Sequence, residues 1–377
     1  MAQRLKLAPM PVETEDVVFD ITRLYRNRLS AFGTGVDRID LAIALDLVER
    51  FGDRCRFIHV CYGGFAEMSA EDARALLSAL DRRWATGEGE GGRDLRWPLL
   101  MKRFQPQDWG DATYVVASHS GLPQREGYLK RFDPQGRIKR IAFIHDIIPI
   151  EFPEYQTERS QRIFRQYLLE LTDRPCRFVV NSTHTGERLA HHLESVGREI
   201  EAPIVNIPQL DPIPVVPNAA LSPRLLDAVG DRPFFVILGT IEPRKNHLLL
   251  FSLWRDMMRD GPPPRLLVVG RRGWMNDNIV AILDRNEALK DCIREFSDLS
   301  DLEIGQLMAR AAALLFPSFA EGLGIPLLEA RAAGLPVIAS DLPALREVGG
   351  EDVTYLSPLD GAAWRREIET RAAIASS

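Results

Sequence analysis

Two carboxylates flank a glycine turn in the second half of the chain, and these side chains are well placed to do chemistry. Glu321 is followed by Gly322, Leu323 and Gly324, and Glu329 lies eight positions after Glu321. Glycines at the start of a helix suit a phosphate, because the free N–H groups and the helix dipole attract an anion. A glutamate near a helix start is also favoured by the dipole alone. The combination of two acids with a phosphate-type turn predicts a site for a phosphorylated ligand.

Short apolar runs on both sides of this turn predict the elements that hold it. Residues 311–316 predict a buried strand, because the run is short and bounded by breakers. Pro326 suits the first turn of a helix, and Gly334 suits the left-handed end of that helix. Residues 336–339 predict the next buried strand. The turn therefore joins a strand to a helix, as in an α/β domain.

Two adjacent cations form the next candidate group. Arg244 and Lys245 lie between an apolar strand pattern over residues 234–238 and an apolar helix pattern over residues 248–258. Cations in such a connecting loop are often only solvated.

The first half of the chain contains a weaker turn of the same kind. Gly33 and Gly35 follow a predicted strand at residues 17–21 and precede a helical pattern that starts near Val36. The third glycine of the dinucleotide-binding fingerprint is missing. A tight turn without a ligand is therefore the alternative to a phosphate site.

One histidine is placed by a predicted strand. Residues 141–144 predict a buried strand that ends at His145 and Asp146. Ligands of open α/β sheets gather at the carboxyl ends of the strands, which makes this pair a candidate. A histidine at a strand end is otherwise usually structural.

Composition and charge exclude several classes of protein. The chain has 377 residues, of which 45% are hydrophobic and 27% charged, as in a soluble globular protein of two domains. A net charge of −6 argues against a general nucleic-acid binder. The four cysteines form no C-x-x-C pair and predict buried thiols in a reducing compartment. The chain start lacks a signal-peptide core, and no apolar run approaches the roughly 18 residues of a membrane span. We therefore expect a cytoplasmic protein.

A proline-rich stretch marks the expected domain boundary. Residues 206–217 contain four prolines and predict a stiff linker. Strand and helix patterns alternate on both sides of it. They predict two doubly wound, Rossmann-like α/β domains over residues 1–210 and 218–377.

A basic stretch at residues 130–140 allows two interpretations. It contains Lys130, Arg131, Arg137, Lys139 and Arg140. Such a patch is most often a solvated surface. The alternative is contact with anionic lipid or with a lipid diphosphate acceptor, which predicts a peripheral contact with the inner membrane.

Three strings of residues resemble segments of one enzyme family. The string E-G-L-G-I-P-L-L-E, from Glu321 to Glu329, resembles the E-x7-E motif of retaining glycosyltransferases of family 4. The string H-D-I-I-P-I-E-F-P-E-Y, from His145, resembles the H-D-x-x-P segment of bacterial members, and G-T-I-E-P-R-K-N-H, from Gly239, resembles their donor-diphosphate loop. The family has the GT-B fold. This implies two Rossmann-like domains facing a cleft, with the acceptor on the first domain and the nucleotide sugar on the second.

The resemblance also implies roles for individual residues. His145 would lie beside the transferred sugar, and Asp146 would orient His145 or contact the acceptor. Glu321 would bind hydroxyls of the sugar, and Glu329 would bind hydroxyls of the ribose. The residues expected around the donor diphosphate are Gly33, Gly35, Gly239, Thr240, Arg244, Lys245, Gly322, Leu323 and Gly324. Many relatives have Arg in place of Thr240, and Arg244 would supply that charge here.

The implied function is retaining transfer of a hexose from a nucleotide sugar to a lipid-linked or oligosaccharide acceptor in bacterial surface polysaccharide synthesis. We expect mannose from GDP-mannose, with dTDP-rhamnose, UDP-glucose or GDP-fucose as alternative donors. The sequence shows no Asp-x-Asp metal motif. We therefore expect no metal and no cofactor other than the nucleotide sugar as co-substrate. The departing phosphate would take the acceptor proton, so no protein group is assigned as the general base.

Other proteins with the GT-B fold are the alternatives. A phosphorylase needs a pyridoxal-binding lysine arrangement that the sequence lacks, and inverting epimerases lack the E-x7-E string. A catalytically idle binding subunit is a further alternative. Only about twenty residues follow the last predicted strand at residues 353–356. Family members usually continue with a terminal helix that crosses to the first domain, so we expect a truncated chain or an abbreviated crossing.

Overall fold

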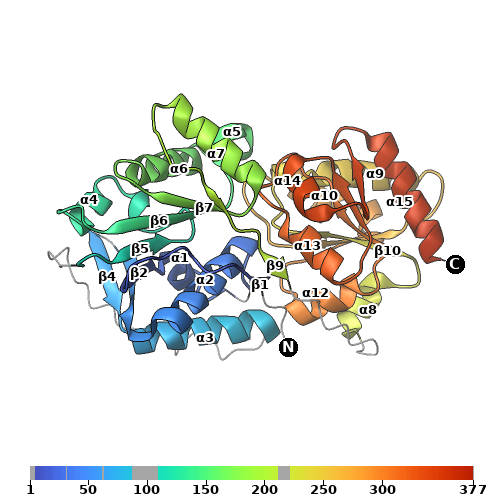
Figure 1. The fold of residues 1–377 in the computed structure, drawn as a ribbon. Coiled ribbons are helices and arrows are strands. Elements are labelled where there is room, and N and C mark those ends of the chain that lie inside the picture. Colours follow the sequence, from blue (N-terminus) through green and yellow to red (C-terminus); the bar gives the residue numbers. More distant parts are fainter. Residues whose placement is uncertain (1–4, 31, 62, 87–108, 211–220, 377) are drawn as a thin grey trace. The chain divides into compact units, whose positions relative to one another are not determined.

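The chain forms two compact units in the computed structural model, which describes residues 5–30, 32–61, 63–86, 109–210 and 221–376 (Figure 1). The N-terminal unit consists of Leu5–Pro153 and Glu158–Gln209, and the C-terminal unit consists mainly of the chain from Leu210 onward. The short segment Glu154–Thr157 belongs to the C-terminal unit, although both of its flanks lie in the N-terminal unit. Among the described residues before 210, this segment alone belongs to the C-terminal unit.

A seven-stranded sheet organises the N-terminal unit, in the order β4-β3-β2-β5-β6-β7-β8. Neighbouring strands are parallel except for the antiparallel pair β3 and β4. The strand order reverses between β2 and β5, so the loops after these two strands open beside each other at the carboxyl edge. The strands are β2 (Val17–Asp20), β3 (Cys55–Cys61), β4 (Gly64–Met68), β5 (Thr113–Val116), β6 (Lys139–Ile144), β7 (Arg177–Val180) and β8 (Ile204–Val205).

Helices connect these strands and cover the sheet. Apolar residues recur at helical spacing in the second helix, where Ile39, Ile43 and Leu47 are buried. The helices are α1 (Thr22–Arg26), α2 (Gly35–Phe51), α3 (Ala70–Thr86), α4 (Tyr128–Phe132), α5 (Ile148–Glu151), α6 (Glu158–Leu171) and α7 (Thr183–Ser195). A separate two-stranded sheet pairs β1 (Leu5–Lys6) with β9 (Gln209–Leu210).

A six-stranded parallel sheet organises the C-terminal unit, in the order β12-β11-β10-β13-β14-β15. Counted along this unit, the order is third, second, first, fourth, fifth and sixth. This is the doubly wound arrangement, in which ligands bind where the order reverses, here between β10 and β13. The strands are β10 (Phe234–Leu238), β11 (Arg265–Val269), β12 (Ile293–Phe296), β13 (Ala313–Phe316), β14 (Val337–Ser340) and β15 (Val353–Leu356).

Both faces of this sheet are covered. Phe235 and Ile237 of β10 belong to one buried hydrophobic cluster, and the alternating residues Val236 and Leu238 belong to another. This burial explains why the strands are almost entirely apolar. The helices are α8 (Pro223–Val229), α9 (His247–Met257), α10 (Asp277–Arg285), α11 (Glu287–Lys290), α12 (Asp301–Met308), α13 (Ile325–Ala332), α14 (Pro343–Gly349) and α15 (Gly361–Ala375).

The last helix, α15, packs within the C-terminal unit. Trp364 and Ile368 of α15 are fully buried in the cluster that also contains Phe251 and Trp254 of α9. The indole of Trp364 donates to the carbonyl of Ser357 at 2.9 Å. Among the residues that the structure describes, no helix combines the length and the apolar character needed to cross a bilayer.

The elements predicted around the glycine turn are confirmed. The strand β13 ends at Phe316, α13 begins at Ile325 beside Pro326, and Gly334 has a φ of 70°. The sequence patterns did not predict β4 or α3, whose residues lie in a stretch without clear periodicity. Of the predicted linker at residues 206–217, residues 211–217 lie outside the described residues.

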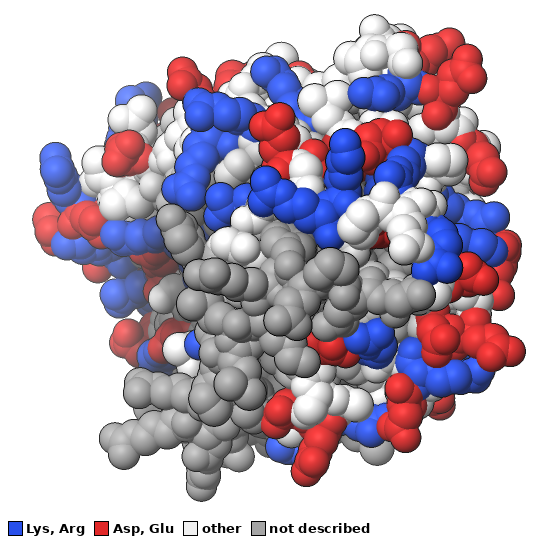
Figure 2. Space-filling view, turned by 90° about the vertical axis from the view of Figure 1, so that its left-hand side faces the viewer, with Lys and Arg blue, Asp and Glu red and all other residues white. Residues whose placement is uncertain are grey.

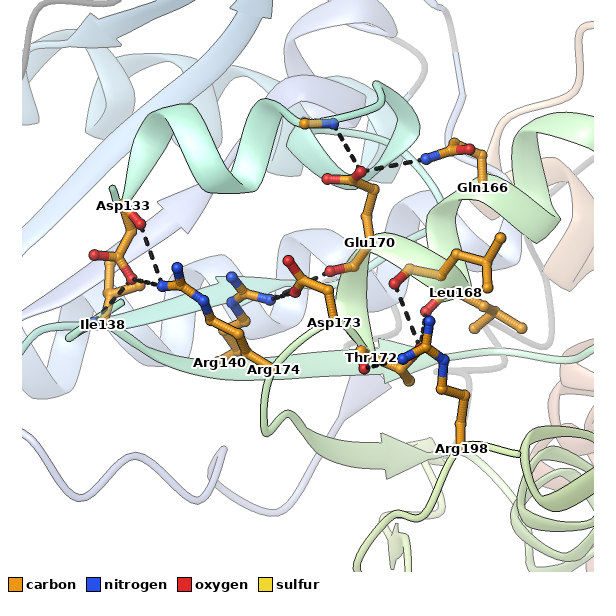
Figure 3. A network of polar contacts seen from close by, with 12 residues as sticks. Asp133, Ile138, Arg140, Gln166, Leu168, Glu170, Thr172, Asp173, Arg174 and Arg198 are labelled. Atoms are coloured by element: carbon orange, nitrogen blue, oxygen red, sulfur yellow. Dashed lines mark hydrogen bonds and ion pairs between the residues drawn. The ribbon is translucent and has the colours of Figure 1, made fainter. Parts of the chain in front are cut away.

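The basic stretch at residues 130–140 divides between surface and interior. Arg140 is buried, and its guanidinium pairs with the carboxylate of Asp173 and donates to the carbonyl of Glu170 at 3.2 Å (Figure 3). The interpretation of Arg140 as a solvated or lipid-facing cation is therefore wrong, because this side chain joins β6 to the end of α6. The exposed cations of the stretch are Lys130, Arg131, Arg137 and Lys139.

Candidate functional site

A buried cluster of charges lies at the switch point of the C-terminal unit. Lys245 Nζ lies 2.5 Å from Glu321 Oε1, and Arg244 Nη1 lies 2.9 Å from Glu321 Oε2. Arg244 Nη2 also lies 2.7 Å from Glu242 Oε1. The side chains of Lys245 and Glu321 are only 9% and 7% exposed. The structure thus brings together the two cations and the first acid that the sequence singled out.

The order of the strands explains this meeting. Arg244 and Lys245 follow β10, Glu321 follows β13, and these two strands are direct neighbours. Hydrogen bonds to main-chain carbonyl oxygens then join the two loops. Phe319 N donates to Arg244 O at 2.8 Å, and Arg244 Nη1 donates to Ala320 O at 2.8 Å.

Burial and charge act in opposite directions on Glu321. Burial raises its pKa, but Lys245 and Arg244 together outweigh burial and lower the pKa of Glu321 from 4.5 to about 2. Burial and the neighbouring Arg244 lower the pKa of Lys245, while Glu321 opposes them. The short contacts favour the ionised pair at neutral pH. Two cations are therefore held by two carboxylates, Glu321 and Glu242.

The glycine turn leads from β13 into α13. Gly324 precedes the helix with a φ of 96°, and a Cβ there would lie 2.5 Å from Leu345 Cδ2. This position therefore has no room for a side chain, and Gly324 itself is buried. Leu323 is buried in the hydrophobic core, so its side chain is unavailable to a ligand. Glu329 lies on α13 and is 7% exposed.

Close glycine contacts also shape the loop after β10. Gly239 has a φ of 137°, and a Cβ on Gly270 would lie 1.9 Å from the Gly239 carbonyl oxygen. A Cβ on Gly273 would lie 2.7 Å from Thr240 Cγ2. The loops after β10 and β11 are therefore packed against each other, with Thr240 between them.

A residue from the first half of the chain contributes to this edge of the C-terminal unit. The ring of Tyr155, in the segment Glu154–Thr157, stacks on Phe319 with centroids 5.9 Å apart and 11° between the planes. The Tyr155 carbonyl accepts from Trp274 Nε1 at 2.8 Å. Because Phe319 lies two residues before Glu321, Tyr155 supports the loop that carries this acid.

The predicted glycine turn of the N-terminal unit lies between α1 and α2. A Cβ on Gly33 would lie 2.7 Å from the ring of Trp84. Packing against α3 therefore explains this glycine without a ligand. Gly35 is the first residue of α2. Their contact with a diphosphate stays a prediction.

The start of α2 is fixed by Asp37. Asp37 and Thr34 form a capping box, in which each side chain accepts from the main chain of the other residue. Asp37 Oδ1 also accepts from Arg23 Nε at 2.6 Å and from Asn27 Nδ2 at 2.6 Å. Burial raises the pKa of Asp37, but Arg23 and Thr34 outweigh it, and the net effect is a lowered pKa.

His145 directly follows β6 and is buried, with 7% exposure. Its Nε2 lies 2.7 Å from the carbonyl oxygen of Ala117, which follows the neighbouring strand β5. Asp40 of α2 approaches the same nitrogen, with Oδ1 at 3.7 Å. Asp146 Oδ1 accepts from Ile148 N, at the first residue of α5, at 3.0 Å. The acid beside the imidazole is therefore Asp40, and the predicted contact of Asp146 with the acceptor stays untested.

Two buried acids near the carboxyl edge were missed by sequence reasoning. Asp20, the last residue of β2, accepts from Tyr114 Oη of β5 at 2.7 Å and from Leu122 N after β5 at 2.9 Å. Asp40 did carry a signal, because it lies on the apolar face of α2 between Ile39 and Ile43. An acid within an apolar helical stripe needs a partner, and only the fold shows that partner.

A second histidine lies in the loop after β5. Burial, with Arg23 and His145 nearby, lowers the pKa of His119 to about 3. His119 is therefore neutral at physiological pH and able to exchange hydrogen bonds with a hydroxyl group. The string around it, Ser118-His119-Ser120, gave no recognisable sequence signal.

The C-terminal site can bind an anion and stabilise charge on a leaving group. Arg244, Lys245 and the main-chain N–H groups before α13 supply the positive potential. Within the described ranges, no group of three or more His, Cys, Asp or Glu side chains is arranged to hold a metal ion.

Comparisons with known proteins agree with this chemistry. Residues 223–362 match the family model described as glycosyl transferases group 1. The chain is 30% identical over 222 residues to the serotype-specific mannosyltransferase WbdA of Escherichia coli, a match that covers 57% of this chain and 27% of WbdA. The matched part thus spans about a quarter of the length of that relative. The chain is also 27% identical over 272 residues to the O-antigen chain mannosyltransferase B of Escherichia coli. This match covers 70% of this chain and 69% of the relative.

The fold also matches solved structures. The crystal structure of Anabaena HepE in complex with UDP-glucose superposes with a TM-score of 0.61 over 96% of this chain and 92% of HepE, at 17% identity. At this identity the likeness concerns the fold alone. The chain has the GT-B fold, built from two Rossmann-like units whose sheets are parallel except for the pair β3 and β4.

Proposed function

We propose that this chain is a retaining glycosyltransferase that moves a hexose from a nucleotide sugar to a glycan or lipid-linked acceptor. Its residues 223–362 match the family model of glycosyl transferases group 1. The observation that carries the proposal is the buried cluster of Lys245, Arg244 and Glu321 beside the glycine turn. It lies at the switch point of a doubly wound sheet, where nucleotides bind.

The proposed chemistry follows from this charge arrangement. The bond between the sugar C1 and the diphosphate oxygen breaks, and C1 forms a bond to the acceptor oxygen on the same face. The acceptor hydroxyl gives its proton to the departing phosphate oxygen. Lys245, Arg244 and the N–H groups of the turn stabilise the negative charge on the diphosphate. This preorganised charge supports a reaction that needs no metal ion.

Carboxylates and a histidine are assigned to the hydroxyl groups. Glu321, ionised because of its two cations, accepts hydrogen bonds from hydroxyls of the sugar. Glu329 accepts from the ribose, and its place on α13, after the turn, supports this role. The N-terminal unit supplies His145 to the transferred sugar and binds the acceptor, while the C-terminal unit binds the nucleotide.

The proposed donor is GDP-mannose, and the proposed context is synthesis of a bacterial surface polysaccharide. Two relatives named as mannosyltransferases, one of them of O-antigen chains, support this choice. The alternative donors are dTDP-rhamnose, UDP-glucose and GDP-fucose. Thermal unfolding of the purified chain with GDP, UDP, dTDP and ADP sugars separates them. Preferential stabilisation by GDP-mannose is expected, and preferential stabilisation by a UDP or dTDP sugar would overturn this assignment.

Turnover is measured separately from binding. The purified chain is incubated with each donor, and release of the nucleoside diphosphate is followed with and without mannosyl acceptors. Release is expected with the donor that stabilises the fold. A donor that binds without any release would indicate a catalytically idle binding subunit instead of an enzyme.

We also propose a peripheral contact with an anionic membrane surface. Figure 2 shows Lys and Arg side chains gathered in a band on the face of the N-terminal unit that carries α4. The exposed cations Lys130, Arg131 and Arg137 support this location, since each basic residue near an anionic surface contributes about 1 kcal/mol. Flotation with anionic vesicles but not with neutral ones is expected. Equal flotation after charge reversal of all three residues would contradict the proposal.

A further inference from the structure

The acid Asp40 differs from the structural acid that precedes it by one helical turn. Asp37 receives hydrogen bonds from Arg23, Asn27 and Thr34. Asp40 is as deeply buried, with 1% exposure, yet its Oδ1 has no hydrogen-bond partner among the residues that the structure describes. An unsatisfied buried carboxylate oxygen is costly, so its presence requires an explanation other than packing.

The imidazole of His145 lies close to this oxygen. Asp40 Oδ1 lies 3.7 Å from His145 Nε2, which is too long for a hydrogen bond but close enough for charges to interact. Burial raises the pKa of Asp40, and the neighbouring His145 and Arg23 oppose this rise. The carboxyl group therefore faces the Nε2 edge of the ring from α2.

The tautomer of His145 follows from its other contact. Ala117 O lies 2.7 Å from Nε2, and a carbonyl oxygen only accepts hydrogen bonds, so Nε2 carries the hydrogen. In the neutral ring, Nδ1 then carries a lone pair. Within the described part of the chain, Nδ1 is buried and has no hydrogen-bond partner. Both ring nitrogens are therefore enclosed by the N-terminal unit, and their surroundings set the orientation of the ring.

We propose that Asp40 is a positioning residue that acts through His145. Together with the Ala117 carbonyl, it holds the hydrogen on Nε2 and fixes the orientation of the imidazole beside the bound sugar. Two acceptors on the same side of the ring disfavour the opposite tautomer, in which Nε2 would present a lone pair to both oxygens. The role in transfer rests on the proposed function, whereas the tautomer is a property of this unit alone.

The first test replaces the carboxylate by an apolar group of similar size. Asp40→Leu is expected to lower kcat on the order of 100-fold, because a small displacement of a group in the site can reduce the rate by that factor. Nucleotide affinity should stay unchanged, because the proposed nucleotide site lies in the C-terminal unit. Asp40→Asn, which keeps an oxygen acceptor, should restore part of the activity. Asp46→Leu is the matched control, because Asp46 lies on the same helix and pairs with Arg50 at a partly exposed site.

Stability separates positioning from a structural role. If Asp40 only positions His145, Asp40→Leu removes an unsatisfied buried acid, so its melting temperature should equal or exceed that of the unmodified chain. A loss of stability in parallel with the loss of kcat would assign Asp40 a structural role and overturn the proposal. Unchanged kcat in Asp40→Leu would overturn it as well.

The tautomer is read directly by ¹⁵N NMR of the histidine side chains. The unmodified chain should show His145 protonated at Nε2 only, and Asp40→Leu should show a mixture of tautomers. His145→Gln identifies the resonance. An unchanged tautomer in Asp40→Leu would overturn the proposal even if no glycosyl transfer is found. Absence of turnover in the unmodified chain would overturn the proposed function and leave this result intact.

Discussion

Glu321 pairs with two cations, Lys245 and Arg244, and this pairing should make the free energy of unfolding depend on pH in acid. Its pKa is about 2 in the folded chain, compared with 4.5 for an ordinary glutamate. A carboxylate with a lowered pKa binds fewer protons folded than unfolded, so its contribution to stability is complete above pH 4.5 and is lost as the pH falls towards 2. Glu321→Gln should therefore flatten the pH dependence of the free energy of unfolding in this window.

Urea unfolding between pH 5 and the lowest pH at which the chain folds measures this dependence. Glu351→Gln is the control, because Glu351 is an exposed acid of the same unit. A Glu321→Gln slope equal to that of the control would contradict the ion-paired state of Glu321.

The two acids of the motif should separate binding from turnover. Glu329→Ala is expected to weaken nucleotide binding about 10- to 100-fold, because a hydrogen bond to a charged acceptor contributes about 1.5–3 kcal/mol. Glu321→Ala should mainly lower turnover, since its proposed contact is with the sugar. Calorimetric titration with GDP and initial rates with GDP-mannose give the two quantities. Unchanged GDP affinity in Glu329→Ala would remove this residue from the ribose.

His145 gives a third residue-level prediction. His145→Ala should lower the transfer rate without unfolding the protein, because its contact with Ala117 is a single hydrogen bond at a strand end. Circular dichroism and initial rates measure both effects. Full activity in the variant would return His145 to a structural role.

Among the elements, the turn before α13 depends on backbone geometry that glycine alone adopts easily. Gly324 has a φ of 96° and no room for a Cβ beside Leu345. Gly324→Ala should cost about 1–3 kcal/mol from strain, with a further loss from the clash. Gly334→Ala is the matched control, because Gly334 has a φ of 70° and no other atom lies within 4 Å of the place that its Cβ would take. Urea unfolding measures both variants, and equal losses of unfolding free energy would show that the Leu345 contact does not matter.

The sequence predicts elements well where the determinants are local. The strand, turn and helix from β13 to α13 follow from an apolar run, glycines and one proline, all within a few residues. The meeting of Lys245 with Glu321 needed the resemblance, because their loops lie 76 positions apart. Asp40 and Tyr155 remained unpredicted, because their partners are set by the order of strands and by the path of the chain. The long-range pairing of these residues leaves no local pattern.

On the scale of the whole molecule, both units place their candidate groups at the carboxyl edge of a parallel sheet. Arg244 and Lys245 lie in the loop after β10, and Glu321 lies in the loop after β13. His119 and His145 follow β5 and β6. Parallel strands make this edge the place where loops converge. The chain links the two sets directly, because Tyr155 follows His145 by ten residues and yet belongs to the C-terminal unit.

Tyr155 should therefore affect nucleotide binding although it is encoded in the first half of the chain. Tyr155→Ala removes the ring that stacks on Phe319, and an aromatic pair contributes about 0.5–1.5 kcal/mol beyond its buried area. Because Phe319 precedes Glu321 in the same loop, GDP affinity should fall about 3- to 10-fold, while Tyr155→Phe keeps the stack and the affinity. Tyr128→Ala, in α4 of the N-terminal unit, is the control and should bind GDP normally. If Tyr155→Ala bound GDP as tightly as this control, the segment Glu154–Thr157 would have no part in shaping the donor loop.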